Sequence, residues 1–236
     1  VAAAREGKNS VILERSDHVG GLPVNGLGAT DIATRGATAG LFARFVVLNK
    51  AHYTEKNGAD SQQVRDCSDG YHFEPSVAAE TFARMLAEAG PGRITVLTGR
   101  QFDAEARYVE KRGDRIVSIR ILDRATGREE HYRGAVFIDA TYEGDLGAAA
   151  GVPFRTGREG AAEYGEPCAG KIYRWWKHGP DADGTTYEGD DAIQAYNYRL
   201  CLTDDPQNRL AIPRPENYDR EEYVSLVGDV LDGRNT

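Results

Sequence analysis

The first residues that could do chemistry end a short apolar run near the start of the chain. Residues 11–13 are Val-Ile-Leu, and Glu14 and Arg15 follow them. In a βαβ nucleotide-binding unit, a carboxylate just past the second strand accepts hydrogen bonds from the ribose hydroxyls of an adenosine. A strand-end carboxylate without a ligand fits the same pattern. Glu14 is therefore a candidate ribose ligand, and Arg15 would flank the adenine or lie in solvent.

A glycine pair, Gly20 and Gly21, follows soon after this carboxylate. Because glycine has no side chain, the backbone N–H groups of such a pair can approach a bulky cofactor closely. The alternative is that the two glycines only shape a turn. Both interpretations predict a tight loop after the strand, and the first makes that loop part of a cofactor site.

A third group of candidate residues follows the apolar run at residues 135–138, which we expect to form a second buried parallel strand. Ala140, Thr141, Gly144 and Asp145 come after this run. Open α/β sheets bind ligands at the carboxyl ends of their parallel strands. Asp145 could there orient a water beside a ribityl chain or a phosphate, or it could instead be a helix N-cap.

The sequence assigns no catalytic acid or base. Its five histidines stand singly, and His18 is the one closest to the glycine pair. Cys67, Cys168 and Cys201 lie far apart with no CxxC pair, so their spacing predicts neither a disulfide framework nor a metal site. Cysteines used in this way are typical of a reducing compartment, and we predict no metal.

Composition excludes some classes of function. The chain has 236 residues, of which 40% are hydrophobic and 28% charged, as in an ordinary globular protein. Its 29 basic and 37 acidic residues give a formal charge of −8, which argues against nucleic-acid binding. The apolar runs are far shorter than a bilayer span, so no membrane partner is predicted.

Helices are predicted at three places before residue 90. Residues 1–7 indicate the end of a helix, with Gly7 as its last signal. Apolar residues at helical spacing predict a helix around residues 41–51. Another helix is expected to begin at Ser76, whose side chain could cap it, and to stop at Gly90.

The strands predicted between these residues and position 140 are of two kinds. The apolar run at residues 94–97 predicts a short parallel strand, in which Val96 would present its backbone to an adenine or simply pack in the sheet. Residues 104–110, 115–122 and 128–133 predict antiparallel strands, because turn signals separate them and the middle one alternates apolar and polar residues.

In this order the elements resemble the FAD-dependent oxidoreductases that have a glutathione-reductase-like FAD-binding fold. The runs Gly20–Leu22, Gly26–Asp31, Asp139–Leu146 and Tyr198–Thr203 are similar to those of a bacterial subgroup, and the resemblance covers nearly the whole chain. It implies an α/β fold class, with an incomplete Rossmann-like FAD-binding domain over residues 1–150. That domain would combine a parallel sheet with a three-stranded antiparallel meander, and residues 151–236 would begin a substrate or cap region.

The same resemblance implies FAD as the cofactor and hydride transfer between the flavin and an organic small molecule of unknown identity. It places Glu14 at the adenosine ribose and the strand containing Val96 beside the adenine. The loop at Gly20 and Gly21 would lie near the pyrophosphate and flavin, and residues 140–145 would return the chain to the cofactor. The oligomeric state is not assigned.

The start of the chain indicates a fragment. Only 13 residues precede Glu14, whereas a glycine-rich fingerprint normally lies about 20 residues before such an acid. We therefore expect the fingerprint to lie upstream of Val1, and the isolated fragment to be inactive and to retain FAD poorly. An export signal would also lie upstream, so no compartment is assigned beyond a cytoplasmic default.

Two other functions stay open. An NAD-binding dehydrogenase-like domain would use the same adenosine site without a flavin, although the meander favours FAD because a plain NAD fold has helical crossovers there. A non-enzymatic carbohydrate- or partner-binding module would depend on exposed aromatic residues. Candidates for such a surface, or for the wall of a substrate pocket, are Tyr173, Trp175, Trp176, Tyr196 and Tyr198.

Overall fold

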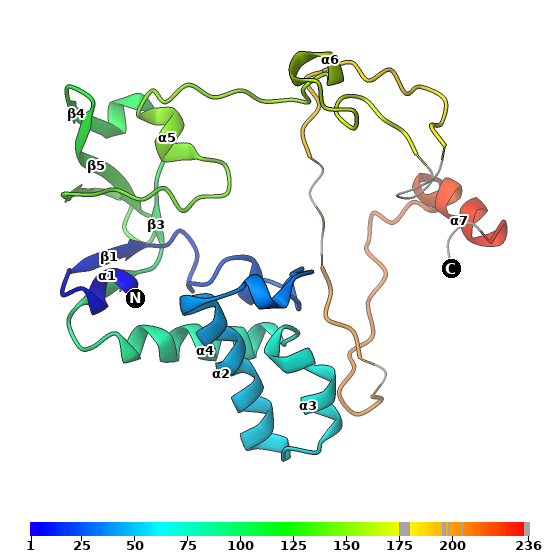
Figure 1. The fold of residues 1–236 in the computed structure, drawn as a ribbon, viewed down its shortest axis with the longest axis horizontal. Coiled ribbons are helices and arrows are strands. Elements are labelled where there is room, and N and C mark those ends of the chain that lie inside the picture. The colour runs from blue at the N-terminus through cyan, green and yellow to red at the C-terminus, as the bar shows by residue number, and fades with distance from the viewer. Residues whose placement is uncertain (175–179, 195–196, 198, 204, 234–236) are drawn as a thin grey trace. The chain divides into compact units, whose positions relative to one another are not determined.

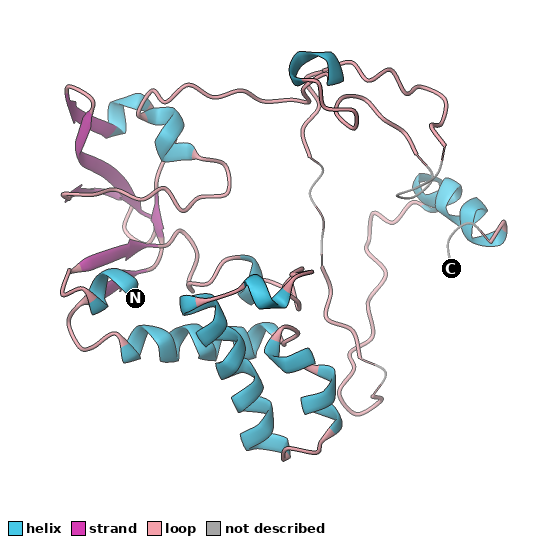
Figure 2. Cartoon of the chain, viewed as in Figure 1, coloured by secondary structure: helices cyan, strands magenta, loops and turns pink. Residues whose placement is uncertain are grey.

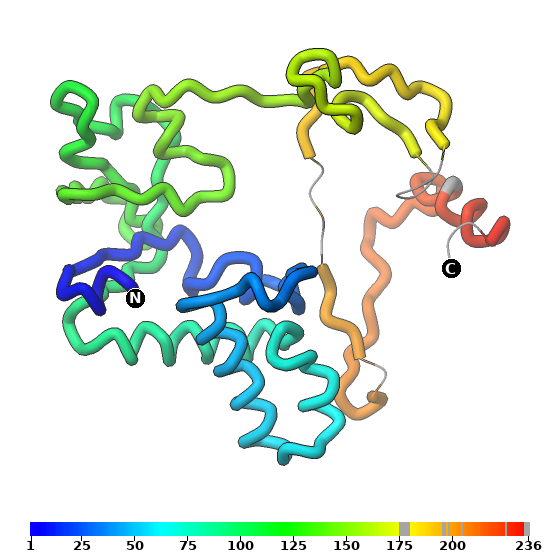
Figure 3. Tube along the Cα trace, in the orientation of Figure 1, coloured from blue at the N-terminus to red at the C-terminus, as the bar shows by residue number. Residues whose placement is uncertain are grey.

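Strands occur only before residue 134 in the part of the chain that the structure describes (Figure 2). The computed structural model describes residues 1–174, 180–194, 197, 199–203 and 205–233. The fold is mixed α/β, as predicted, with one parallel pair of strands and one antiparallel sheet. The chain divides into two units, Val1–Arg199 and Leu200–Thr236 (Figure 3). The boundary near residue 150, between a cofactor region and a substrate region, stays a prediction.

The parallel pair consists of β1 (Ser10–Leu13) and β2 (Ile94–Leu97), which are aligned from their first residues to their last. Helix α1 (Ala2–Arg5) precedes β1 (Figure 1). Gly7 follows this helix with a φ of 72°, a conformation that suits glycine at a helix end. The end of the helix and both short strands are therefore confirmed.

The predicted meander is confirmed as an antiparallel sheet. Its strands are β3 (Arg100–Gln101), β4 (Val109–Arg112), β5 (Arg115–Asp123) and β6 (Arg128–Arg133). Strand β5 is central, because β3, β4 and β6 all pair with it (Figure 1). The first predicted strand is shorter than expected, since the 3-10 helix η4 (Ala106–Tyr108) occupies part of it.

One face of this sheet covers a small core that also touches the parallel pair. Ile119, Ile121 and Leu146 are buried at its centre. The partly buried residues packed around them are Leu13, Phe102, Val109, Ile116, Tyr132 and Phe137. Because Leu13 is the last residue of β1, this core joins the end of the parallel pair to the meander.

The parallel strand predicted at residues 135–138 is wrong. These residues form no ladder, and Val136 and Ile138 are 77% and 82% exposed. Phe137 alone packs against the core of the antiparallel sheet. A strand needs a paired neighbour for its backbone N–H and C=O groups, and residues 135–138 pair with none of the described strands.

A helical layer contains the larger core. Its elements are η1 (Leu22–Val24), η2 (Arg35–Ala37), α2 (Gly40–Asn57), α3 (Gln62–Asp66), η3 (Ser68–Gly70) and α4 (Pro75–Glu88). Helices α2 and α4 pack against each other (Figure 1). Buried apolar side chains from η1, α2 and α4 meet between them, among them Val24, Phe45 and Met85. The helix predicted around residues 41–51 is thus confirmed as part of α2.

The start of α4 differs from the expectation. The helix begins at Pro75, Glu74 is its N-cap residue, and no side chain caps it, so the role given to Ser76 is wrong. Proline is favourable at the first helical position because the missing N–H would have no helical partner there. Gly90 follows the helix with a φ of 96°, as expected of a helix end.

A fully buried amide joins the two long helices to the turn between them. Asn49 of α2 donates from Nδ2 to the carbonyl of Gly70 at 3.1 Å, and Thr81 Oγ1 of α4 donates to Asn49 Oδ1 at 2.7 Å. A Cβ atom at Gly70 would overlap the carbonyl oxygen of Val46, so only glycine allows the turn to lie this close to α2.

The later part of the chain has short helices and long loops. The helices are α5 (Asp145–Ala149), α6 (Ala161–Tyr164), η5 (Arg220–Tyr223) and α7 (Val224–Leu231). None of the described helices is both long enough and apolar enough to cross a membrane. Of the predicted aromatic surface, Tyr173 is 47% exposed. Its other members, Trp175, Trp176, Tyr196 and Tyr198, lie outside the described residues.

Candidate functional site

Glu14 lies directly after β1, and the two neighbouring strands hold its backbone. Its N–H donates to the carbonyl of Leu97 at 2.9 Å, and its carbonyl accepts from the N–H of Arg100 at 2.8 Å. The half-buried carboxylate is oriented by Ser16, whose N–H and Oγ both lie 2.8 Å from Oε1. Oε2 accepts no hydrogen bond from any described residue. One carboxylate oxygen is thus held in place while the other is available to a ligand.

The structure places Arg15 and Val96 near the same end of the parallel pair. Arg15 is exposed, and its carbonyl accepts a hydrogen bond from Arg124 Nη1 at 3.0 Å, which ties the loop to the meander. Val96 pairs with Ile12 in the ladder and is 36% exposed. Both positions are compatible with contact to a ligand at the strand end, and their roles stay predictions.

The loop that follows presents unused hydrogen-bond donors. The backbone N–H groups of residues 18–21 donate to no acceptor in the described part of the chain. Gly20 packs closely on the helical layer, where an added Cβ would lie 2.5 Å from Val24 and 2.9 Å from Phe82. Free amides in a loop fixed by a core are suited to binding an anion such as a phosphate.

Tyr142 brings the second predicted loop onto the glycine pair. The N–H of Leu22 donates to Tyr142 Oη at 2.5 Å. A Cβ atom on Gly21 would overlap the same oxygen, and Gly21 has a φ of 59°. The structure therefore brings together the two glycine-containing segments, which are about 120 residues apart in sequence, as one surface.

The segment from Asp139 to Gly147 is a turn that satisfies its own amides. Asp139 Oδ1 accepts from the N–H and Oγ1 of Thr141, and Asp139 Oδ2 accepts from the N–H of Gly147 at 2.9 Å. Thr141 Oγ1 in turn accepts from the N–H groups of Gly144 and Asp145, at 2.9 and 3.1 Å. The side chains of Asp139 and Thr141 therefore satisfy backbone N–H groups at the start of α5, as an N-cap side chain would.

The alternative role given to Asp145, that of a helix N-cap, is wrong. Helix α5 begins at Asp145, its N-cap residue is Gly144, and neither provides a capping side chain. Partial burial of Asp139 raises the pKa of that carboxyl, but hydrogen bonds from the backbone of Gly147 and from Thr141 outweigh this effect and lower its pKa. Ala140 and Tyr142 are exposed beside the turn, and the ligand roles of Ala140, Thr141, Gly144 and Asp145 stay predictions.

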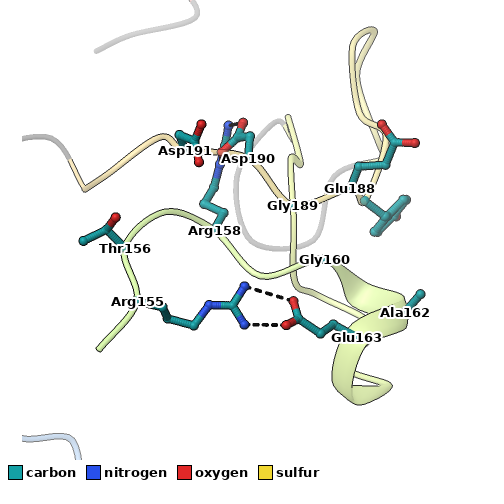
Figure 4. Close-up of a pocket in the computed structure, with 11 residues that line it drawn as sticks. Arg155, Thr156, Arg158, Gly160, Ala162, Glu163, Glu188, Gly189, Asp190 and Asp191 are labelled. Carbon is teal, nitrogen blue, oxygen red and sulfur yellow. Dashed lines mark hydrogen bonds and ion pairs between the residues drawn. The ribbon is translucent and has the colours of Figure 1, made fainter. Parts of the chain in front are cut away.

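A separate groove of about 500 Å³ lies within residues 155–191 (Figure 4). Two arginine–carboxylate pairs line it. Arg155 Nη2 lies 3.2 Å from Glu163 Oε2, and Arg158 Nε lies 2.7 Å from Asp190 Oδ1. The hydrogen bond between Arg158 and Asp190 raises the pKa of the arginine and lowers that of the carboxyl. Both arginines therefore already have anionic partners.

Comparison with known protein families shows the family to which the chain belongs. The sequence model of a family described as FAD dependent oxidoreductase matches residues 1–232. The chain belongs to this family. FAD dependent oxidoreductases use FAD for redox chemistry, so the cofactor expected from the sequence is confirmed. No curated protein and no solved structure matches the chain.

The chemistry of the described residues fits FAD. Glu14 offers a carboxylate oxygen of the kind that accepts hydrogen bonds from ribose hydroxyls. The amides of residues 18–21 are donors of the kind that phosphate oxygens require. A long, polyanionic dinucleotide could therefore bind along this surface, from the end of β1 over the glycine loop.

Three residues that shape this site were not identified from the sequence. Ser16 orients Glu14, Tyr142 covers Gly21, and Asp139 builds the second turn together with Thr141, which was predicted. The Asp-Ala-Thr order was a usable signal, since Asp commonly accepts hydrogen bonds from the backbone two residues later. Tyr142 had no such signal, because its partner is distant in sequence.

Proposed function

We propose that this FAD dependent oxidoreductase binds the adenosine and pyrophosphate of FAD at the carboxyl end of β1, within a Rossmann-like domain. The observation that carries the proposal is the half-free carboxylate of Glu14 beside the free amides of residues 18–21. Ligands bind at this end of parallel strands in open α/β sheets. The antiparallel strands β4–β6 favour FAD over NAD, because a plain NAD-binding fold has a helical crossover at this point of the chain.

In this proposal each residue has a limited task. Glu14 accepts hydrogen bonds from the ribose, and Ser16 keeps its carboxylate in that orientation. The amides of Gly20 and Gly21 donate to phosphate oxygens, and Tyr142 holds the second turn against them. Bound FAD supplies the electron transfer, and the protein contributes positioning and electrostatics.

The proposed reaction is hydride transfer between the flavin and a small organic molecule. We place the substrate with the part of the chain after residue 150, where the groove between Arg158 and Glu163 offers charged and backbone polar groups. The formal charge of −8 supports a small-molecule substrate over a nucleic acid, and no membrane partner is proposed. The catalytic acid or base is not assigned.

Titration with FAD tests this proposal, with the visible absorption of bound flavin as a second measurement; because the isolated chain is expected to bind FAD weakly, the result is the difference in affinity between variants. Glu14→Ala should weaken FAD binding by about 1–3 kcal/mol, the usual effect of losing a hydrogen bond to a charged group. Glu55→Ala is a matched control, because Glu55 is an exposed carboxylate on α2 away from the strand end. Equal dissociation constants for the wild type and Glu14→Ala would contradict the role of Glu14.

A further inference from the structure

His18 lies in the loop between Glu14 and the glycine pair, and both of its ring nitrogens face oxygen atoms. Nδ1 lies 2.5 Å from Asp17 Oδ1, and Nε2 lies 3.1 Å from Asn25 Oδ1. The Asn25 amide is oriented by a second contact, since its Nδ2 donates to the carbonyl of Gly21 at 2.8 Å. A chain of hydrogen bonds thus runs from Asp17 through His18 and Asn25 to Gly21.

The orientation of Asn25 decides the protonation state of His18. Because the Asn25 nitrogen is used by Gly21, its oxygen must accept from His18 Nε2, which therefore carries a proton. The Asp17 carboxylate likewise requires a proton on Nδ1. A neutral imidazole carries only one proton and would leave one nitrogen lone pair facing an oxygen. Only the imidazolium satisfies both contacts.

We propose that His18, as an imidazolium, is a positioning residue that fixes the Gly20–Gly21 loop for FAD through Asn25. Its importance for FAD rests on the function proposed above. The geometry also argues against His18 as a catalytic base, a role that its closeness to the glycine pair would suggest. A histidine whose two ring nitrogens are both hydrogen-bonded has no free nitrogen to accept a proton.

The proposal predicts a pH dependence with a definite sign. The charged groups that act on His18 are Asp17, through a hydrogen bond, and Glu14 at longer range. The hydrogen bond to Asp17, followed by that to Asn25, raises the pKa of His18. The network is therefore complete below the ordinary histidine pKa and is lost as the pH rises through the raised pKa. The remaining proton stays on Nδ1, where Asp17 accepts it. Deprotonation therefore removes the hydrogen bond from Nε2 to Asn25, and Asn25 is then no longer held in the orientation that binds Gly21.

NMR of the full chain without FAD tests the positioning role by itself. The nitrogen shifts of the His18 ring report its protonation, and the amide signals of Gly20 and Gly21 report the loop. We expect these glycine signals to shift with the same midpoint as the His18 ring in the wild type and to lose that transition in Asn25→Ala. Glycine signals that ignore the His18 titration would overturn the proposal.

FAD titration across the same pH range tests the consequence for the cofactor. At a pH below the transition, His18→Ala should weaken FAD binding about tenfold, the usual effect of one hydrogen bond to a charged group. His18→Gln keeps a neutral donor and should bind FAD without the pH dependence. The control is His131→Gln, since His131 is exposed on β6.

The outcomes separate this proposal from the proposed function. Wild-type and His18→Ala chains that bind FAD equally at every pH would overturn the role of His18. A wild type that binds no FAD, while its glycine signals follow His18, would contradict the proposed function and support His18 as the residue that positions the loop.

Discussion

The two glycine-containing turns of the candidate site use their backbone donors in opposite ways. In the loop around Gly21 the N–H groups of residues 18–21 have no acceptor in the described part of the chain. In the turn around Gly144 the side chains of Asp139 and Thr141 accept from four N–H groups. Both turns are glycine-rich and follow an apolar run, so their sequences look alike.

The difference shows that a glycine turn after a strand is a ligand site only where its amides are left open. The first loop gains its shape from packing on Val24 and Phe82 and from the Asn25 contact to the Gly21 carbonyl, which leave its N–H donors free. The second gains its shape from hydrogen bonds that consume its donors. The first is therefore suited to hold a phosphate, and the second is suited to support the first through Tyr142.

The largest effect is expected at the point where the two turns meet. Gly21→Ala should lower the free energy of unfolding by about 2 kcal/mol, because the backbone conformation favours glycine and the new Cβ displaces Tyr142 Oη together with its hydrogen bond. Gly113→Ala is a matched control with a similar φ of 60° and open space around it, so only about 1 kcal/mol should be lost. Chemical denaturation measures both, and equal losses would contradict the close contact.

A smaller effect is expected inside the self-satisfied turn. Thr141→Ala removes the acceptor for the N–H groups of Gly144 and Asp145 and should cost about 1–2 kcal/mol of stability, as for other lost helix caps. Thr141→Ser keeps the hydroxyl and should cost less. If this turn is only a support, calorimetry should show nearly unchanged FAD affinity in Thr141→Ser, and a large loss of affinity there would mean that the threonine methyl contacts the cofactor.

The smallest effect is expected from the hydroxyl that links the turns. Tyr142→Phe removes the acceptor for the N–H of Leu22, and the stability loss should stay below about 1 kcal/mol because water can replace it at an exposed site. Thermal unfolding measures the change. Tyr108→Phe offers a control on η4, where the ring lies against Arg107. A loss at Tyr142 several times that at Tyr108 would mean that the link is more than a surface contact.

Local sequence patterns correctly predicted several of the strands. The apolar runs of β1 and β2 and the alternation of Ile119 and Ile121 were sufficient to identify two kinds of sheet. The run at residues 135–138 has the same local character, yet it pairs with no described strand, because strand formation depends on tertiary pairing that a local pattern does not report.

The candidate site, like the fold, could be predicted from the sequence only in part. Glu14 and the glycine pair were found from their place after a strand, and the structure puts them on one surface. Which amides stay free could not be predicted, since that depends on Thr141 and Asp139 reaching particular atoms within a folded turn. Tyr142 was missed for the same reason, because its partner Leu22 is brought near only by the fold.

The buried Asn49 matters more for uniqueness of packing than for stability. Apolar surfaces of two helices tolerate many relative positions, but sliding α4 along α2 would separate Thr81 from Asn49 and leave buried polar groups unpaired. The pair thus selects one alignment among competing ones. Because Phe82 is the next residue on α4 and lies against Gly20, the alignment that Asn49 selects also determines where the glycine loop can rest.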